Sequence, residues 1–372
     1  MDVDFTGATV LRGRALDDAP VHVSGGVIAD APVGRAVDLS GFTILPGIID
    51  LHGDGFERHV APRRGAMTDL TEGLRAAEAE LAANGITTGY LAQFFSWEGG
   101  LRGPEFGGRV MAALRDVARQ VVTDLRGQVR LEVHLLEEYA ALPDKLAAWG
   151  CDYVVFNDHL PHDRLAEGRR PPRLTGQALK AGRNPDDHFA TMLALHARRG
   201  EVPAALDGLC AELSAKGVRM GSHDDSGGRT EWLRRGVRIA EFPETLETAE
   251  TAGGPVILGA PNLVRGSSHK GNVSALDVVS IGACDALASD YHYPSPRRAA
   301  QSLVRAGVLD LPDAWALISS GPAQVMGLTD RGTLAPGKRA DLVVLDNAER
   351  VALTMAGGQI SYMNGEIGAR FI

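Results

Sequence analysis

The chain has 372 residues, of which 44% are hydrophobic and 23% are charged. This composition is typical of a soluble globular protein and excludes a disordered chain. The net charge of −9 disfavours nucleic acid and membranes as partners but allows a small phosphorylated ligand. The N-terminal residues do not resemble a signal peptide, and no apolar run approaches the ~20 residues of a membrane helix. Three widely spaced cysteines without a Cys-x-x-Cys motif indicate reduced thiols, so we expect a cytoplasmic protein.

Both ends of the chain show the pattern of short β-strands. Residues 1–45 contain the apolar segments FTGATVL, VHVSGGVIAD and FTIL, which glycine and aspartate separate. Residues 332–346 and 360–367 have the same character. We therefore expect one small, discontinuous β-sandwich domain formed by residues 1–45 and 325–372.

The middle of the chain alternates between short apolar runs and amphipathic helical patterns. The eight apolar runs are 48–52, 86–93, 129–137, 152–158, 217–223, 237–243, 254–262 and 283–290. The clearest helical patterns cover 70–81, 110–121 and 206–213. Eight buried strands that alternate with helices predict an α/β fold, a parallel (β/α)8 TIM-type barrel over residues 46–324. The segment 158–187, rich in Arg, Pro and Gly, is expected to be a long loop over the mouth of the barrel.

Polar residues follow most of the apolar runs, where the barrel strands are expected to end. In (β/α)8 enzymes the catalytic residues come from the C-terminal ends of the strands. The candidates in chain order are His52, Asp54, Gln93, Glu132 or His134, Asn157, Asp158, His159, His223, Asp224, Asp225, Glu241, Asn262 and Asp290. Residues of this set would therefore lie close enough together to share a ligand.

His52 and Asp54 follow the first apolar run in the pattern His-x-Asp. Residues i and i+2 of an extended strand point to the same side, so both side chains could bind one cation. Imidazole nitrogen and carboxylate oxygen suit Zn²⁺, Mn²⁺ or Fe²⁺. The alternative is that the two side chains only cap a loop, but the preceding Pro-Gly and the buried IID favour a metal site.

Two segments carry a family resemblance, LPGIIDLHGD near the first run and GTLAPGKRADLVVLD near the C-terminus. The chain resembles the amidohydrolase superfamily of metal-dependent hydrolases over nearly its whole length. His-x-Asp, in place of the more common His-x-His, resembles one subgroup, the diphosphatase of the carbon–phosphorus lyase pathway for alkylphosphonate use. Other strings similar to that subgroup are SHDD (222–225), EFPETLETA (241–249), GAPNLVRGSSHKGN (259–272) and ASDYHYP (288–294).

The resemblance implies roles for several residues at strand ends. Asp290, after the last strand, would bind a metal and accept the proton of the attacking water, and His223 would be a further ligand. Since no lysine lies near a strand end to act as the carboxylated lysine of many members, Glu132 is the predicted bridging ligand, with His134 as its rival. The predicted ligands of one or two divalent ions, Zn²⁺ by preference and Mn²⁺ or Fe²⁺ as alternatives, are His52, Asp54, Glu132, His223 and Asp290.

A basic segment after the seventh apolar run predicts phosphate binding. Residues 264–272 (VRGSSHKGN) contain Arg265, His269 and Lys270 among glycines. Loops at this position commonly hold phosphate in (β/α)8 enzymes, and arginine and lysine neutralise its charge. The predicted substrate-binding residues are His159, Glu241, Asn262, Arg265, His269 and Lys270.

Following the resemblance, we expect a hydrolase that acts on a phosphoanhydride. Its reaction would convert alpha-D-ribose 1-methylphosphonate 5-triphosphate into the 5-phosphate and diphosphate. The alternative is a deacetylase of an N-acetyl sugar phosphate or an N-acyl amino acid, with the same metal site. A third interpretation is a metal-free scaffold that keeps only the fold. The oligomeric state stays open, a homo-oligomer being one option.

Overall fold

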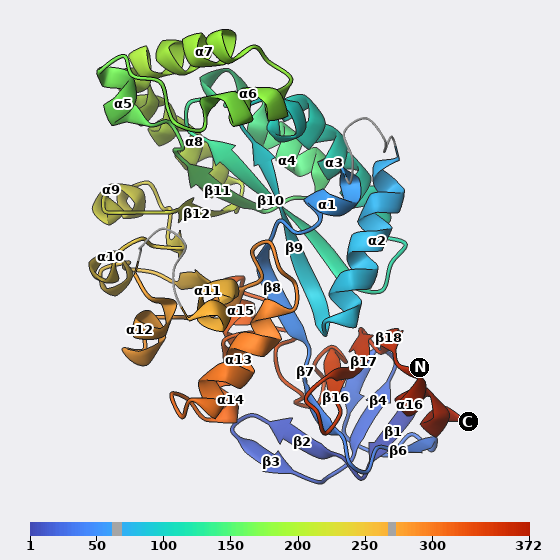
Figure 1. Ribbon diagram of the computed structural model, residues 1–372. Coiled ribbons are helices and arrows are strands. Elements are labelled where there is room, and N and C mark those ends of the chain that lie inside the picture. The colour runs from blue at the N-terminus through green and yellow to red at the C-terminus, as the bar shows by residue number, and fades with distance from the viewer. Residues whose placement is uncertain (62–68, 267–272) are drawn as a thin grey trace. The chain divides into compact units, whose positions relative to one another are not determined.

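The computed structural model has an α/β fold in which eight parallel strands alternate with helices (Figure 1). It describes residues 1–61, 69–266 and 273–372. Its contacts divide the chain into a first unit of residues 1–91, 116–126 and 255–372 and a second unit of residues 92–115 and 127–254. Among the described residues, no helix is both long and apolar enough to cross a membrane.

The two ends of the chain come together in two small sheets of the first unit. One sheet has the order β5–β4–β1–β6 and the other has the order β18–β17–β16–β7–β2–β3. Their strands are β1 (Val3–Thr6), β2 (Thr9–Arg12), β3 (Ala15–Asp17), β4 (Val21–Ser24), β5 (Val27–Ala29), β6 (Ala36–Asp38), β7 (Thr43–Pro46), β16 (Leu342–Leu345), β17 (Val351–Ala356) and β18 (Gln359–Met363). Because β7 pairs in parallel with β2 and antiparallel with β16, both ends share one sheet, as predicted.

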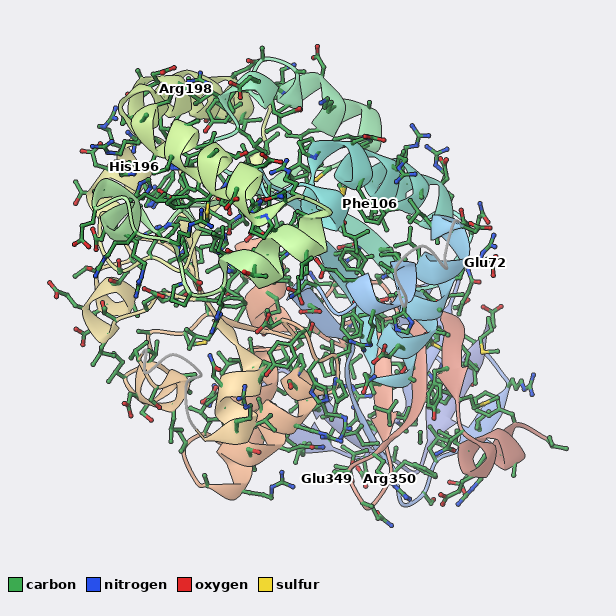
Figure 2. The ribbon with its side chains drawn as sticks, turned by 45° about the horizontal axis from the view of Figure 1, so that its top comes forward. Glu72, Phe106, His196, Arg198, Glu349 and Arg350 are labelled. Atoms are coloured by element: carbon green, nitrogen blue, oxygen red, sulfur yellow. The ribbon has the colours of Figure 1, made fainter. Side chains whose placement is uncertain are left out.

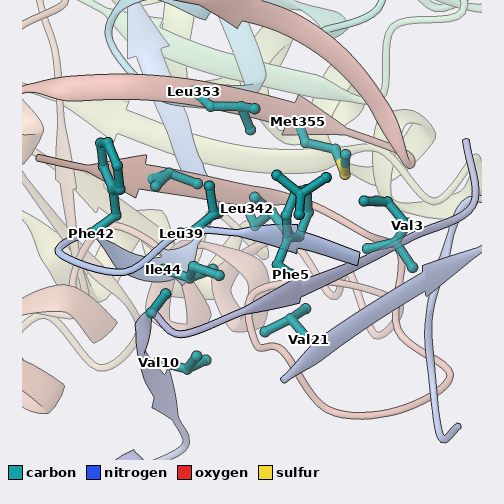
Figure 3. Packing of buried hydrophobic residues seen from close by; sticks show 14 of the residues in the cluster. Val3, Phe5, Val10, Val21, Leu39, Phe42, Ile44, Leu342, Leu353 and Met355 are labelled. Carbon is teal, nitrogen blue, oxygen red and sulfur yellow. The ribbon is translucent and has the colours of Figure 1, made fainter. Parts of the chain in front are cut away.

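The two small sheets share a hydrophobic core (Figure 3). In β4, Val21 and Val23 are buried while the residues between and after them are half-buried, which is the period of two that a strand with one covered face requires. Phe5 from the first sheet and Ile44 and Leu342 from the second belong to the same buried cluster. The terminal segments therefore form a separate domain, whose exact boundaries stay a prediction.

The eight strands of the barrel follow one another through their sheet in sequence order, from β8 to β15. They are β8 (Ile48–Gly53), β9 (Ile86–Phe95), β10 (Asp124–Glu132), β11 (Tyr153–Asn157), β12 (Arg219–His223), β13 (Ile239–Glu241), β14 (Val256–Gly259) and β15 (Ala286–Ala288). A parallel bridge between Gly53 and Asp290 makes the first strand a neighbour of the residues that follow the last one. The predicted (β/α)8 class is therefore confirmed.

Helices lie in the connections between the strands, and the helix at residues 365–368 follows the last strand, β18. They are α1 (Glu57–Val60), α2 (Leu70–Ala83), α3 (Pro104–Val117), α4 (Leu142–Trp149), α5 (His162–Ala166), α6 (Leu174–Ala181), α7 (Pro185–Ala197), α8 (Val202–Ala215), α9 (Arg229–Arg234), α10 (Leu246–Glu250), α11 (Ala260–Arg265), α12 (Ala275–Ser280), α13 (Ser295–Arg305), α14 (Leu311–Ala316), α15 (Ser320–Val325) and α16 (Gly365–Gly368). The Asp69 side chain caps α2 by accepting hydrogen bonds from the Thr71 and Glu72 backbone N–H groups.

Three local predictions were wrong. The segment 158–187 is not one long loop, because it contains α5 and α6, whose Leu165 and Leu174 pack in a buried cluster with Met192 of α7. His134 does not share a strand with Glu132, since β10 ends at Glu132. Asn262 does not follow a strand, because it lies within the short helix α11.

The Asp4 carboxylate in β1 gives the terminal domain a predicted acid sensitivity. It accepts hydrogen bonds from the Val33 and Gly34 backbone N–H groups and from His22, and these lower its pKa below the ordinary 3.8 although burial opposes the shift. A lowered pKa stabilises the fold above about pH 4 and the effect is lost as the pH falls through the folded-state value.

We therefore expect Asp4→Asn to unfold at a lower temperature than the wild type at pH 7. The difference should shrink as the pH falls below about 4 toward the lowered folded-state pKa of Asp4, because protonation removes the charge that these hydrogen bonds stabilise. Thermal unfolding followed by circular dichroism between pH 3 and pH 7 measures this. Asp2→Asn is the control, because exposed Asp2 accepts only a 3.2 Å bond from the Gly25 N–H among its described contacts. A pH-independent difference would contradict the prediction.

Candidate metal centre

The first unit brings His52, Asp54 and Asp290 together. His52 is a buried residue of β8, whose six residues are all buried, while Asp54 and Asp290 are half-buried. The His52 carbonyl accepts a 2.8 Å hydrogen bond from the Asp290 N–H, and the Asp290 carbonyl accepts a 2.9 Å bond from the Asp54 N–H. These two backbone bonds hold Asp290, which follows the last strand, between His52 and Asp54 at the end of the first strand.

The geometry of the three side chains fits a divalent cation. One ligand atom from each residue lies within 4.8 Å of the other two. One imidazole nitrogen and two carboxylate oxygens are donors that Zn²⁺, Mn²⁺ and Fe²⁺ accept, at metal–ligand distances of about 2.0–2.2 Å. Modest rotations of the side chains would thus allow one ion to contact all three.

Buried Asp50 fixes the backbone on which these ligands lie. Its carboxylate accepts hydrogen bonds from the Ser289 N–H at 2.8 Å and from the Ser289 hydroxyl at 2.5 Å. Burial raises the pKa of Asp50, against the opposing effect of the Ser289 hydrogen bonds and the nearby His52. A Cβ atom at Gly53 would lie 2.7 Å from an Asp50 oxygen and 2.8 Å from the Tyr293 ring, so only glycine allows this close approach.

Asp290 has a left-handed backbone conformation, with φ at 55°. Aspartate and asparagine tolerate this region better than most residues, although it still costs free energy. Strained residues of this kind concentrate at functional sites, where the surrounding structure holds them in place. Here the hydrogen bonds to His52 and Asp54 hold the strained residue.

The second unit carries a different group of residues around Glu132, at the end of β10. This carboxylate is fully buried and accepts hydrogen bonds from the Trp97 indole at 3.3 Å and from the His159 backbone N–H at 3.2 Å. The His159 Nδ1 atom also donates to it. A buried carboxylate is costly unless it is paired, and these donors satisfy that requirement.

Alternate residues of β10 point to the same side of the strand and contact the ends of β12 and β13. The Gln128 amide donates to Glu241 at 2.6 Å, as does the Tyr153 hydroxyl at 2.5 Å. Arg130 donates to His223 Nε2 at 2.8 Å. Since Nε2 accepts this bond, a neutral His223 carries its proton on Nδ1, which lies 3.4 Å from Glu241.

Arg130 is a buried cation that the sequence analysis did not single out. Its guanidinium carbon lies 3.9 Å from the centre of the Phe94 ring, and that of Arg102 lies 4.0 Å from the same centre. Stacking on an aromatic face stabilises a guanidinium group and restricts its rotamers. The only available signal was an arginine at an inward position of an apolar strand, two residues before Glu132.

The predicted substrate-binding residues are distributed over several elements. His159 and Glu241 belong to the second unit, as described above. Asn262 is half-buried in α11 of the first unit, and exposed Arg265 at the end of that helix donates a 2.9 Å bond to the Tyr291 hydroxyl. The predicted His269 and Lys270 lie outside the described residues.

This fold and these strand-end donors define an amidohydrolase-type hydrolase, and the chain belongs to the amidohydrolase superfamily. A model of the "Amidohydrolase family" matches residues 290–362. Alpha-D-ribose 1-methylphosphonate 5-triphosphate diphosphatase of Escherichia coli (strain K12) is 33% identical over 328 residues, which cover 83% of this chain and 85% of that enzyme.

Solved structures of low sequence identity share the fold. The crystal structure of an amidohydrolase is 15% identical and matches with a TM-score of 0.67 over 98% of this chain and 99% of its own. N-acetyl-D-glucosamine-6-phosphate deacetylase from Mycobacterium smegmatis is 16% identical and matches with a TM-score of 0.62 over 96% of this chain and 99% of its own. At such identities these likenesses support the fold and leave the substrate open.

Proposed function

We propose that this protein hydrolyses a phosphoanhydride and converts alpha-D-ribose 1-methylphosphonate 5-triphosphate into the 5-phosphate and diphosphate. The 33% identity to the Escherichia coli diphosphatase over most of both chains supports this substrate. The observation that carries the chemistry is the donor set of His52, Asp54 and Asp290 at the first and last barrel strands. The proposal places the reaction in phosphonate metabolism in the cytoplasm.

The proposed ligands of one or two divalent ions are His52, Asp54, Glu132, His223 and Asp290. A bound ion supplies Lewis-acid stabilisation of the negative charge that develops on phosphoryl oxygens. His223 can serve as a ligand only if Arg130 moves away from Nε2, which then offers its lone pair to the ion while Nδ1 keeps its proton and faces Glu241. The composition of the site favours Zn²⁺, with Mn²⁺ or Fe²⁺ as alternatives.

The other proposed steps, proton acceptance and substrate binding, are assigned to side chains of the protein. Asp290 accepts the proton of the water that attacks the phosphoanhydride, and Asp54 and His52 fix its position through the backbone bonds described above. Arg265, together with His269 and Lys270, binds the leaving diphosphate, whose negative charge needs cationic partners. His159, Glu241 and Asn262 complete the proposed substrate contacts.

The test is a diphosphate assay of the full chain with the ribosyl triphosphate. We expect metal removal with a chelator to abolish diphosphate release and readdition of Zn²⁺ or Mn²⁺ to restore it. Dialysis removes the chelator before the metal is added back, which controls for a direct effect of the chelator on the assay. Metal-loaded protein that releases no diphosphate would overturn the proposal.

A deacetylase of the same superfamily is the second candidate. It is favoured by the structural likeness to the N-acetyl-D-glucosamine-6-phosphate deacetylase of Mycobacterium smegmatis. A metal site of the same ligands could direct water to an amide carbonyl instead of a phosphorus atom. Release of acetate from N-acetyl sugar phosphates, without diphosphate release from the triphosphate, would establish this candidate.

A further inference from the structure

Another group of side chains that could hold a metal ion lies in the second unit and shares no residue with the ligands proposed above. His134 follows the end of β10, Asp158 follows the end of β11, and His162 begins α5. One ligand atom from each lies within 4.8 Å of the other two. Asp158 Oδ1 is 3.3 Å from His134 Nε2 and 3.2 Å from His162 Nε2, so the carboxylate faces both imidazoles.

His134 contributes a buried nitrogen without a hydrogen bond. Its side chain is only 3% exposed, and its Nε2 atom makes no hydrogen bond within the described part of the chain. The distance to Asp158 is short, but the alignment is not that of a hydrogen bond. A buried polar atom without a hydrogen bond costs free energy, and a cation held together with Asp158 would remove that cost.

His196 fixes the orientation of His162. Its Nδ1 atom, on α7 (Figure 2), lies 2.8 Å from His162 Nδ1, so one of the two nitrogens donates a hydrogen bond to the other. His162 Nε2 donates to the Asp158 carboxylate at 3.0 Å, so a cation bound between them would take the place of the Nε2 proton, and His162 would then donate from Nδ1 to His196. Metal-binding histidines usually donate their other ring N–H to a neighbouring acceptor in this way, which fixes the tautomer and the ring.

The surroundings favour ion binding but leave an entry path. Leu160, Leu165 and Met192 belong to a buried apolar cluster in the same segment of the second unit, and Leu135 and Leu195 pack against it. His162 is 30% exposed and Asp158 is 42% exposed, so an ion can reach the open side of the group. Apolar neighbours limit water access and strengthen the attraction between a cation and its ligands.

We propose that His134, Asp158 and His162 form an additional Zn²⁺ site, with His196 as the positioning residue for His162. Two imidazoles and one carboxylate are a ligand set that zinc accepts, and a water molecule or another small ligand completes the tetrahedron. The ion joins the segments after β10 and β11 to α5. Asp158 precedes His159, which donates to Glu132, so the ion also steadies one of the proposed catalytic ligands.

The experiment measures Zn²⁺ equivalents bound to the full chain after removal of all metal and dialysis against buffered Zn²⁺. We expect His162→Ala to lose one equivalent per chain relative to the wild type and His52→Ala to keep that equivalent. His22→Ala is the matched control, because His22 pairs with the carboxylate of Asp4 at 2.7 Å but belongs to no three-residue metal group among the described residues. It should lose no equivalent.

Asp158→Asn provides a second test with less change in volume. It should also lose one equivalent, and added Zn²⁺ should raise its thermal midpoint less than that of the wild type, because a bound ligand stabilises the folded state. If His162→Ala and Asp158→Asn both bind as many equivalents as the wild type, the site does not exist and the group is a hydrogen-bonded contact only.

The diphosphate assay separates this inference from the proposed function. Loss of one equivalent in His162→Ala, in a protein that releases no diphosphate in any metal-loaded form, would support the additional site and overturn the proposed function. If the protein is an active diphosphatase and the His162 and Asp158 variants bind as many Zn²⁺ equivalents as the wild type, the proposed function is supported and the additional site is overturned.

Discussion

Replacing Asp290 with asparagine is expected to lower the rate of diphosphate release at least about a hundredfold, the usual effect of losing a general base. The asparagine cannot accept the proton of water, and it is a weaker metal ligand than a carboxylate. The fold should be retained for two reasons. Asparagine tolerates the left-handed backbone at φ 55° as well as aspartate does, and the backbone bonds to His52 and Asp54 do not involve the side chain.

Asp285→Asn is the matched control for this experiment. Asp285 directly precedes β15, and its carboxylate accepts a 2.8 Å hydrogen bond from the Val256 N–H, which an asparagine oxygen can also accept. We expect this variant to keep wild-type turnover. Circular dichroism and bound-metal analysis of both variants would show whether the fold and the ions are retained. Near-normal turnover in Asp290→Asn would remove Asp290 from its proposed role.

The barrel was predictable because its strands are short, buried and separated by helical patterns. The run at 48–52 became β8 and the run at 86–93 became β9, with shifts of two residues or fewer at the ends. The proximity of His52 and Asp290 also followed from the sequence, since the first and last strands of a closed barrel are neighbours. Topology thus brings together residues that lie far apart in the chain.

The features that were missed depend on contacts between distant segments. An arginine in an apolar strand gives no sign that its partner is His223, because the pairing depends on which strands become neighbours. The grouping of His134, Asp158 and His162 depends on β10 ending at Glu132 and on a helix that begins at residue 162. The short helices of 158–187 lack a long apolar stripe, and packing against α7 decides their formation.

An ion pair between buried Arg331 and half-buried Asp124, at the start of β10, also lay outside sequence reasoning. Arg331 is 7% exposed and donates to Asp124 at 2.6 Å and to the Thr88 hydroxyl at 2.9 Å. Asp124 also accepts a 3.0 Å bond from Arg126. Burial would raise the pKa of Asp124, but Arg126 and Arg331 outweigh that effect and lower it below 3.8.

We expect Arg331→Met to lower the free energy of unfolding by at most about 3 kcal/mol, the low end for breaking a buried pair, because Asp124 is half-buried and Arg126 still contacts its carboxylate. Arg350→Met should cost less than about 1 kcal/mol, since Arg350, labelled in Figure 2, pairs with Asp346 while 73% exposed. Urea unfolding curves measure both.

The effect of Arg331→Met should diminish as the pH falls through the lowered pKa of Asp124, because protonation removes the charge that Arg331 stabilises. Equal costs for the two variants would show that burial does not strengthen this pair.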